Sequence, residues 1–323
     1  NKRDANGRSA IDQISEYLAK SPLKTRVAEE IDSYIKVLAS AEVALDTDIK
    51  LGESIALANN VVLAMPFIPG SQLGPADEDL PDYVRANKLP EDNITDKAKM
   101  NPDGPGPISM VNTYAPIAAV GEAAIGIGAL VSIPDVDGGI RSEPLLVNYY
   151  GDYFPSMALL LAAKSLNLTV NDIHAEFGNS VSLGRLNIKT DDRSLMNTFF
   201  YSDESGKQAF PVDSFFDVLQ GKIPASKYKD KLVLIGATAI GIGDSMVTPI
   251  NPSMAPVLTL AHSVSSILNE DFLIQPSWGM YATLGAFVLV ALHLMLALPR
   301  MSSVVGFTIT TLLFIIFFSC EYI

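Results

Sequence analysis

The 323 residues could form two average domains, or one large domain followed by a membrane anchor. Hydrophobic residues make up 48% and charged residues 18%, with a mean hydropathy of +0.26, which is too apolar for an ordinary soluble domain and too polar for a polytopic transporter. The net charge of −13 disfavours nucleic acid as a partner, because a phosphate backbone would be repelled. The single cysteine, Cys320, excludes an intramolecular disulfide and cysteine-based metal motifs, and the three histidines lack zinc-hydrolase spacing. We therefore expect no nucleic-acid partner, metal site or cofactor, and a chain divided between a soluble part and a membrane part.

The first third of the chain is predicted to alternate helices with a buried strand. Apolar residues recur at helical spacing over residues 24–41, and a second helix is predicted over 49–58. Residues 61–65 (VVLAM) then indicate a buried strand. Residues 69–107 are rich in Pro, Gly and Asp, which predicts a long excursion over the surface.

The middle of the chain is predicted to be a dense succession of strands and helices. Residues 115–134 are apolar, but Glu122 and three glycines favour a short helix followed by a strand over a membrane span. The predicted elements are strands at 129–133 and 144–150, a helix at 156–166, strands at about 181–188 and 195–201, and helices at 212–219 and 256–269. Residues 231–236 (KLVLIG) show no alternation, so they predict a strand buried on both faces, with Ile235 in a central position. Strands alternating with helices predict an α/β fold with a mixed sheet flanked by helices.

Two uncharged runs close the chain. Residues 278–298 contain no Asp, Glu, Lys or Arg, and about 20 apolar residues are enough for a helix to cross the hydrocarbon. Residues 304–320 are equally uncharged. We expect both to be transmembrane helices, and the lipid bilayer to be a partner. Arg300, in the short loop between them, predicts a cytoplasmic loop and places residues 1–275 outside the membrane.

Three segments in this order resemble the second type of CHASE domain, the extracytoplasmic sensory module of bacterial receptors. They are residues 133–141 (IPDVDGGIR) followed by Pro144-Leu145, residues 153–159 (YFPSMAL), and residues 232–238 (LVLIGAT), the last followed by Asp244 and Thr248-Pro249. The chain departs from the family at residues 256–262 (PVLTLAH), where the usual glycine turn and His-Ala pair are not found. The family usually begins with a transmembrane helix and a strand-helix-strand unit, so the N-terminal part of the family domain is expected to be missing from residues 1–275.

The resemblance implies a membrane-anchored sensor, or ligand-binding domain, of a bacterial signal-transduction protein. It would lie in the inner membrane, with the soluble domain facing the periplasm or the extracellular side. Family members typically continue into a cyclase, kinase or phosphatase, whereas these residues contain no such domain and offer no catalytic set, so we expect no enzyme activity here. The alternative is a structural or docking subunit of a larger membrane or cell-envelope assembly. Either function predicts a homo-oligomer or partner membrane proteins.

The run Asp135-x-Asp137-Gly138-Gly139 has two interpretations. Two carboxylates before a glycine turn resemble a short calcium loop, but a full loop needs a third oxygen ligand and a distant glutamate, and Glu143 is too close. Asp and Gly are also ordinary turn residues. We favour a structural turn fixed by an Asp135–Arg141 or Asp137–Arg141 pair.

The candidate ligand-binding residues are Asp135, Asp137, Arg141, Thr238 and Asp244. Each belongs to a loop that follows a predicted strand, and ligands of α/β sheets sit beyond the carboxyl ends of strands. If the two strands are neighbours and point the same way, these side chains border one crevice suited to a small polar ligand or a charged peptide. The alternative, which we favour, is that the loops lie at opposite ends and each only turns the chain.

Overall fold

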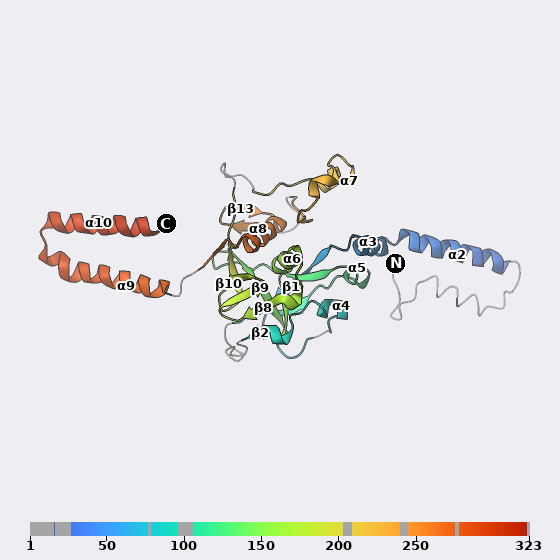
Figure 1. The fold of residues 1–323 in the computed structure, drawn as a ribbon, viewed down its shortest axis with the longest axis horizontal. Coiled ribbons are helices and arrows are strands. Elements are labelled where there is room, and N and C mark those ends of the chain that lie inside the picture. Colours follow the sequence, from blue (N-terminus) through green and yellow to red (C-terminus); the bar gives the residue numbers. More distant parts are fainter. Residues whose placement is uncertain are drawn as a thin grey trace. The chain divides into compact units, whose positions relative to one another are not determined.

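The computed structural model describes Glu16 and residues 27–76, 79–95, 106–202, 209–239, 245–274 and 278–321. The chain divides into two compact units, Asn1–Leu273 and Ile274–Ile323 (Figure 1). The first unit is mixed α/β, with sheets flanked by helices, as the sequence predicts.

Within the described range 27–61, two helices precede the first strand, and both are predicted by the sequence. Helix α2 spans Val27–Leu45 and α3 spans Thr47–Ala58. Asp46 separates them because its carboxylate accepts hydrogen bonds from the first-turn N–H groups of Asp48 and Ile49, both at 3.1 Å, which caps α3.

The main sheet has five strands in the order β4-β1-β3-β6-β7. Their bounds are β1 Val62–Pro69, β3 Ile108–Thr113, β4 Gly126–Leu130, β6 Leu146–Tyr149 and β7 Asp152–Pro155. The pairs β1–β4 and β3–β6 are parallel, whereas β1–β3 and β6–β7 are antiparallel. An isolated parallel bridge between Ala129 and Ser156 brings the two edges of the sheet together, so its inner face encloses a core of its own around Met65, Met110 and Phe154.

Three smaller sheets are found among the other described residues of the first unit. The second sheet, in the order β10-β9-β8-β2, contains β2 Ile94–Thr95, β8 Ile173–Glu176, β9 Ser180–Leu183 and β10 Leu186–Lys189. The third, β14-β11-β5, contains β5 Ser142–Pro144, β11 Leu195–Thr198 and β14 Phe272–Leu273, and β12 Met246–Thr248 pairs with β13 Asn251–Met254. Short helices lie between these strands: α4 Asp82–Arg85, α5 Ala118–Gly121, α7 Phe215–Leu219, and 3₁₀ turns at Glu91–Asn93, Val170–Asp172 and Ala225–Tyr228.

Helix α6, Met157–Ser165, is the most deeply buried helix among the described residues. It packs against β4 and against α8, Pro256–Asn269, and shares a hydrophobic core with β8, β9 and β10. The approach to β4 is so close that a Cβ on Gly128 would lie 2.6 Å from the Met157 Cα, so only glycine fits there. The bounds of α8 agree with the prediction, and its Pro256 occupies the first turn, where proline is favoured.

The prediction of a buried central strand at residues 231–236 is wrong. The segment has no regular secondary structure, and the described residues provide it with no strand partner. Leu232, Val233 and Ile235 are 39%, 48% and 79% exposed. The lack of alternation in an apolar run indicates that both faces could be buried, but it cannot show that a neighbouring strand is in place to bury them.

Smaller differences concern boundaries. The strand predicted at 129–133 is β4, which starts earlier because its glycines are accommodated in close packing. The strand predicted at 144–150 is divided into β5 and β6, and the surface excursion of 69–107 contains α4 and β2. Residues 77–78 and 96–105 of that excursion lie outside the described residues.

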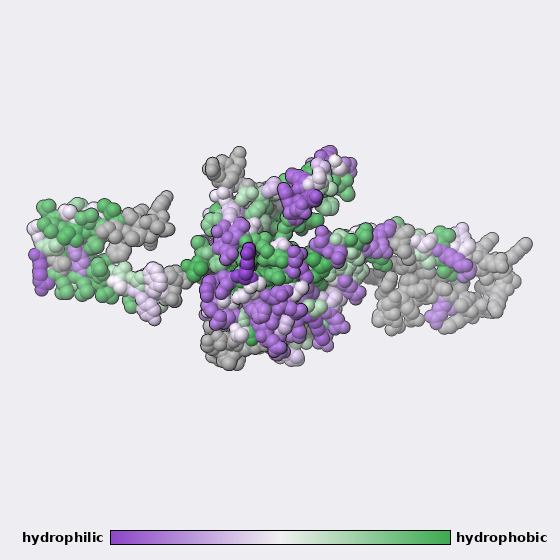
Figure 2. All heavy atoms as spheres, viewed as in Figure 1, coloured by the Kyte–Doolittle hydropathy of each residue, from purple (hydrophilic) through white to green (hydrophobic). Residues whose placement is uncertain are grey.

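The second unit is a pair of apolar helices. Helix α9, Gly279–Leu292, continues through a π-helical turn at His293–Ala297 and a 3₁₀ turn at Leu298–Arg300, and α10 spans Ser303–Glu321. The stretch Gly279–Arg300 is long and apolar enough to cross a membrane, and Ser303–Ile315 is a shorter apolar helix. Figure 2 shows apolar residues dominating the surfaces of α9 and α10, whereas polar residues dominate the visible face of the first unit. Within the pair, His293 Nε2 lies 3.2 Å from Thr310 Oγ1.

A pair of alanine substitutions tests this description of the first unit. Leu159, in α6, is fully buried, so Leu159→Ala should lower the free energy of unfolding by about 2–5 kcal/mol through lost contacts and a cavity. Ile235→Ala should change it by less than about 0.5 kcal/mol, because the side chain is mostly exposed. Urea unfolding of the detergent-solubilised chain measures both values. A large loss for Ile235→Ala would show that the apolar run is buried after all.

Candidate functional site

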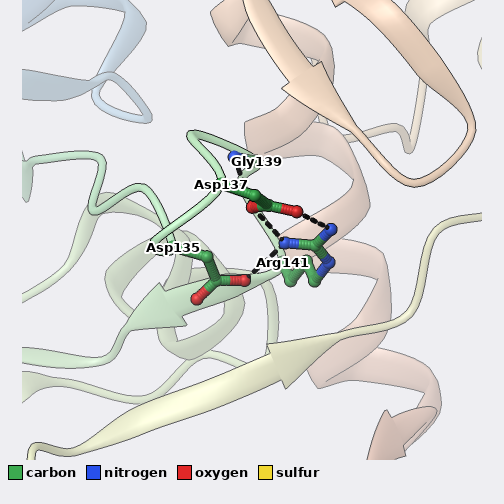
Figure 3. Close-up of polar contacts among 4 residues, drawn as sticks. All are labelled: Asp135, Asp137, Gly139 and Arg141. Atoms are coloured by element: carbon green, nitrogen blue, oxygen red, sulfur yellow. Dashed lines mark hydrogen bonds and ion pairs between the residues drawn. The ribbon is translucent and has the colours of Figure 1, made fainter.

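The turn that follows β4 is closed by its own backbone. The Asp135 N–H donates to the Gly139 carbonyl and the Gly138 N–H donates to the Asp135 carbonyl, both at 2.8 Å. Gly138 has a φ of 80°, a left-handed conformation that glycine adopts without steric cost. The turn therefore brings the side chains of Asp135, Asp137 and Arg141 to one side (Figure 3).

Arg141 binds both aspartates of this turn. Its Nη1 donates to Asp135 Oδ2 and Asp137 Oδ1 at 2.8 Å each, and its Nη2 donates to Asp137 Oδ2 at 2.6 Å (Figure 3). Asp137 Oδ1 also accepts from the Gly139 N–H at 3.0 Å. The hydrogen bonds from Arg141 and Gly139 hold the pKa of Asp137 well below its usual range, and the two aspartates raise the pKa of Arg141. The predicted Asp–Arg pairing is confirmed, and it includes both aspartates at once.

This pairing determines what the turn can do chemically. Both carboxylates are engaged by the guanidinium, so a cation would have to displace Arg141 before it could use them. No group of three or more acidic, histidine or cysteine side chains that could hold a metal is found among the described residues. About half of the Arg141 side chain is exposed, so its remaining N–H groups can still face a ligand.

The other two candidate residues are placed differently. Thr238 is exposed at the end of the run 232–238, and within the described part of the chain no hydrogen bond joins it to the turn. Asp244 lies outside the described residues. Strand β12, which follows Asp244 in the sequence, contacts the turn, since the Ile140 N–H donates to the Val247 carbonyl at 2.7 Å. The shared crevice remains a prediction, as does the separation of Asp137 and Asp244.

A polar network around Glu143 is a feature that the sequence did not reveal. Glu143, in β5, is partly buried, and its carboxylate accepts hydrogen bonds from the hydroxyls of Ser263, at 3.1 Å, and Ser156. Burial raises the pKa of Glu143 to about 7. Ser156 is also the N-cap of α6, because its Oγ accepts from the Leu159 N–H at 3.2 Å. The partners Ser156 and Ser263 are distant in sequence from Glu143, so no local motif could indicate this network.

The polar face of α8 extends this network. Nδ1 of the buried His262 accepts from the Tyr201 N–H at 3.1 Å, and burial lowers the pKa of His262 to about 4, so the ring is neutral at physiological pH. Ser266 accepts from the Phe199 N–H at 2.9 Å and donates to the Asp271 carbonyl. These contacts fix the residues after β11 to α8.

Strand β14, which ends the first unit in the sequence, is hydrogen-bonded to this network. Asn197 donates to the Leu273 carbonyl at 3.2 Å, and the Tyr201 hydroxyl donates to Asp271 at 2.9 Å. Strand β11 pairs with β14 on one side and β5 on the other. Phe272 and Leu273 of β14 are therefore bonded, through β11, to the strand that carries Glu143.

Comparison with known families supplies the identity of this arrangement. A family model described as the CHASE2 domain matches residues 10–298, which is most of the chain and includes both the Asp135–Arg141 turn and α9. The chain belongs to the CHASE2 family. CHASE2 domains are extracellular sensory domains of signalling proteins, which confirms the resemblance noted from the sequence. No curated protein and no solved structure matches the chain.

The raised pKa of Glu143 in this CHASE2 chain gives a pH-dependent prediction. Its ordinary pKa is 4.5, so the folded chain binds the proton more tightly than the unfolded chain, and folding stability falls as pH rises from about 4.5 to about 7. Glu143→Gln keeps the side-chain shape without the ionisation. As the pH rises from 4.5 to 8, the free energy of unfolding of Glu143→Gln should increase by about 1–3 kcal/mol relative to that of the unsubstituted chain.

The difference between the two proteins is the quantity to measure, by urea unfolding at several pH values. His262 has a lowered pKa and contributes stability that is lost as pH falls below 6.5, the opposite direction. This contribution is common to both proteins, so it cancels in the difference. A difference that does not change with pH would mean that the Glu143 carboxyl is solvated.

Proposed function

We propose that this chain is the outward-facing sensor of a bacterial signal-transduction protein, held in the inner membrane by its C-terminal helices and carrying no catalytic activity itself. Membership of the CHASE2 family supports the sensory part of this proposal. The membrane part rests on the helical stretch Gly279–Arg300. It is long and apolar enough to cross a membrane, and none of its most apolar 18 residues is buried.

The contacts inside the second unit suit a helix pair in lipid. Residues 279–298 contain no Asp, Glu, Lys or Arg, and their histidine, His293, lies within hydrogen-bonding distance of Thr310 on α10. Polar side chains in hydrocarbon are stabilised by such interhelical partners. A Cβ on Gly306 would lie 2.9 Å from Leu298 Cδ1, a close approach of the kind that small residues allow between membrane helices.

Signal transfer requires that ligand binding favours one of two arrangements of an element connected to the membrane helices. Strand β14 is suited to this role, because it is only two residues long, pairs with β11 and is the last described strand before α9 in the sequence. A shift of β11 or α8 would therefore reach the start of α9 through β14.

A docking or scaffolding function is the second candidate, and a specific observation favours it. Helix α7 exposes Phe215, Phe216 and Leu219 by 61–71%, and residues 232–235 expose a further apolar run. Clustered exposed apolar side chains are typical of surfaces that bind another protein. A homo-oligomer or a partner membrane protein would be the binding partner.

Cysteine labelling tests the orientation. In a Cys320→Ser background, Ser302→Cys places a thiol in the loop between α9 and α10, and Val136→Cys places one on the fully exposed turn of the first unit. In intact spheroplasts a membrane-impermeant maleimide should label position 136 and leave position 302 unlabelled until the cells are lysed. Labelling of position 302 in intact spheroplasts would contradict the proposed topology.

A further inference from the structure

A cavity of about 310 Å³ lies in the first unit, away from the Asp135–Arg141 turn and the Glu143 network. It is bordered by α4, the end of α5, the first residue of β4, the last turn of α6 and the 3₁₀ turn Val170–Asp172. Its volume is at the lower end of the range for small-molecule sites.

The wall formed by α4 and β4 is held in place by hydrogen bonds. Asn87 is 9% exposed; its amide nitrogen donates to the Tyr83 carbonyl at 2.8 Å, and its Oδ1 accepts from the Ile127 N–H at 2.9 Å. The Tyr83 hydroxyl donates to the Pro116 carbonyl at 2.6 Å. A Cβ on Gly121 would lie 2.5 Å from the Tyr83 ring, so this side of the cavity is close-packed. The cavity is therefore a formed feature of the fold.

Two opposite charges line this cavity without neutralising each other. Lys164 is partly buried in the last turn of α6, and Glu122 follows α5 on the exposed side. Among the described residues neither side chain takes part in an ion pair. A partly buried ammonium is stabilised by an anion, so the cavity can accept a carboxylate at Lys164 and an ammonium at Glu122.

The remaining lining residues restrict the size and polarity of a ligand that the cavity could bind. Ile125 and Val170 supply apolar contacts, and Asn171 is an exposed polar lining residue. The net charge of −13 repels small anions at long range, whereas a ligand with no net charge is not repelled. One positive and one negative group beside a small apolar wall fit a molecule that carries both charges and a short apolar substituent.

We propose that this cavity binds a small zwitterion, an α-amino acid with a short apolar side chain. The proposal supplies a ligand class for the sensory role above and rests on that role for its physiological meaning. Helix α6 links the cavity to the Glu143 network, because Lys164 stands in its last turn and Ser156 caps its first. Binding at Lys164 would thus act on the same rigid nine-residue helix that Glu143 contacts.

Isothermal titration of the full chain in detergent with L-valine tests this proposal. Isovalerate and isobutylamine serve as analogues that each retain one charge, and we expect L-valine to bind at least about tenfold more tightly than either, since a charged hydrogen bond contributes about 1.5–3 kcal/mol. Lys164→Met keeps most of the aliphatic stem, and Glu122→Gln keeps the shape of an exposed side chain. Each should weaken valine binding by about tenfold or more. Lys229→Met, on an exposed lysine outside the cavity, should leave it unchanged.

The outcomes separate the proposal from its alternatives. Equal affinity for L-valine and isovalerate would show an anion site and overturn the zwitterion. Unchanged affinity in Glu122→Gln, or no measurable valine binding by the unsubstituted chain, would also overturn it. Glu122→Gln covers the case in which Lys164→Met does not fold. Absence of valine binding, with Ser302→Cys protected from the maleimide in intact spheroplasts, would reject this ligand and leave the sensor topology intact. Valine binding, with Ser302→Cys labelled in intact spheroplasts, would reject the topology alone.

Discussion

The packing of α6 against β4 is the contact on which the other features of the first unit depend. Six of its nine residues are buried, and the bare backbone of Gly128 lets β4 approach the first turn of the helix. This contact lies beside the bridge between Ala129 and Ser156, where the edges of the main sheet meet, and it positions Ser156 next to Glu143. The opposite end of α6 places Lys164 at the cavity. The two polar regions of the fold are therefore connected by one buried helix.

The region around α8 and β11 leaves more of its buried polar groups without hydrogen bonds than that core does. The hydroxyls of Thr259, Thr190 and Ser194 are buried and find no hydrogen-bond partner among the described residues. A buried polar group left in this state costs about 1–3 kcal/mol. The strands that connect this region to the second unit, β5, β11 and β14, have only two to four residues each. A buried α6 core beside short strands and unsatisfied buried hydroxyls is the distribution expected of a domain in which one part is fixed and another responds.

Local patterns predicted the helices of this chain well and its sheet neighbours poorly. The bounds of α8 were predicted correctly because Pro256 marks its start, and the C-terminal helices were predicted by their lack of charge. The Arg141 pairing was predictable because the three side chains lie within seven residues. Glu143 was missed because Ser263 is 120 residues away in sequence, and the placement of residues 231–236 failed because an apolar run does not specify its partner strand.

The exposed run Leu232–Ile235 also affects how the protein must be handled. A short, uncharged, β-branched-rich segment with unpaired backbone can recruit an identical segment from another molecule and begin to aggregate. Lys229, Asp230 and Lys231 stand directly before it, and charged residues in that position act as gatekeepers that keep such segments apart. High salt screens these charges, with a Debye length of about 3 Å at 1 M. The solubility of the protein should therefore depend on ionic strength more steeply than its net charge alone would suggest.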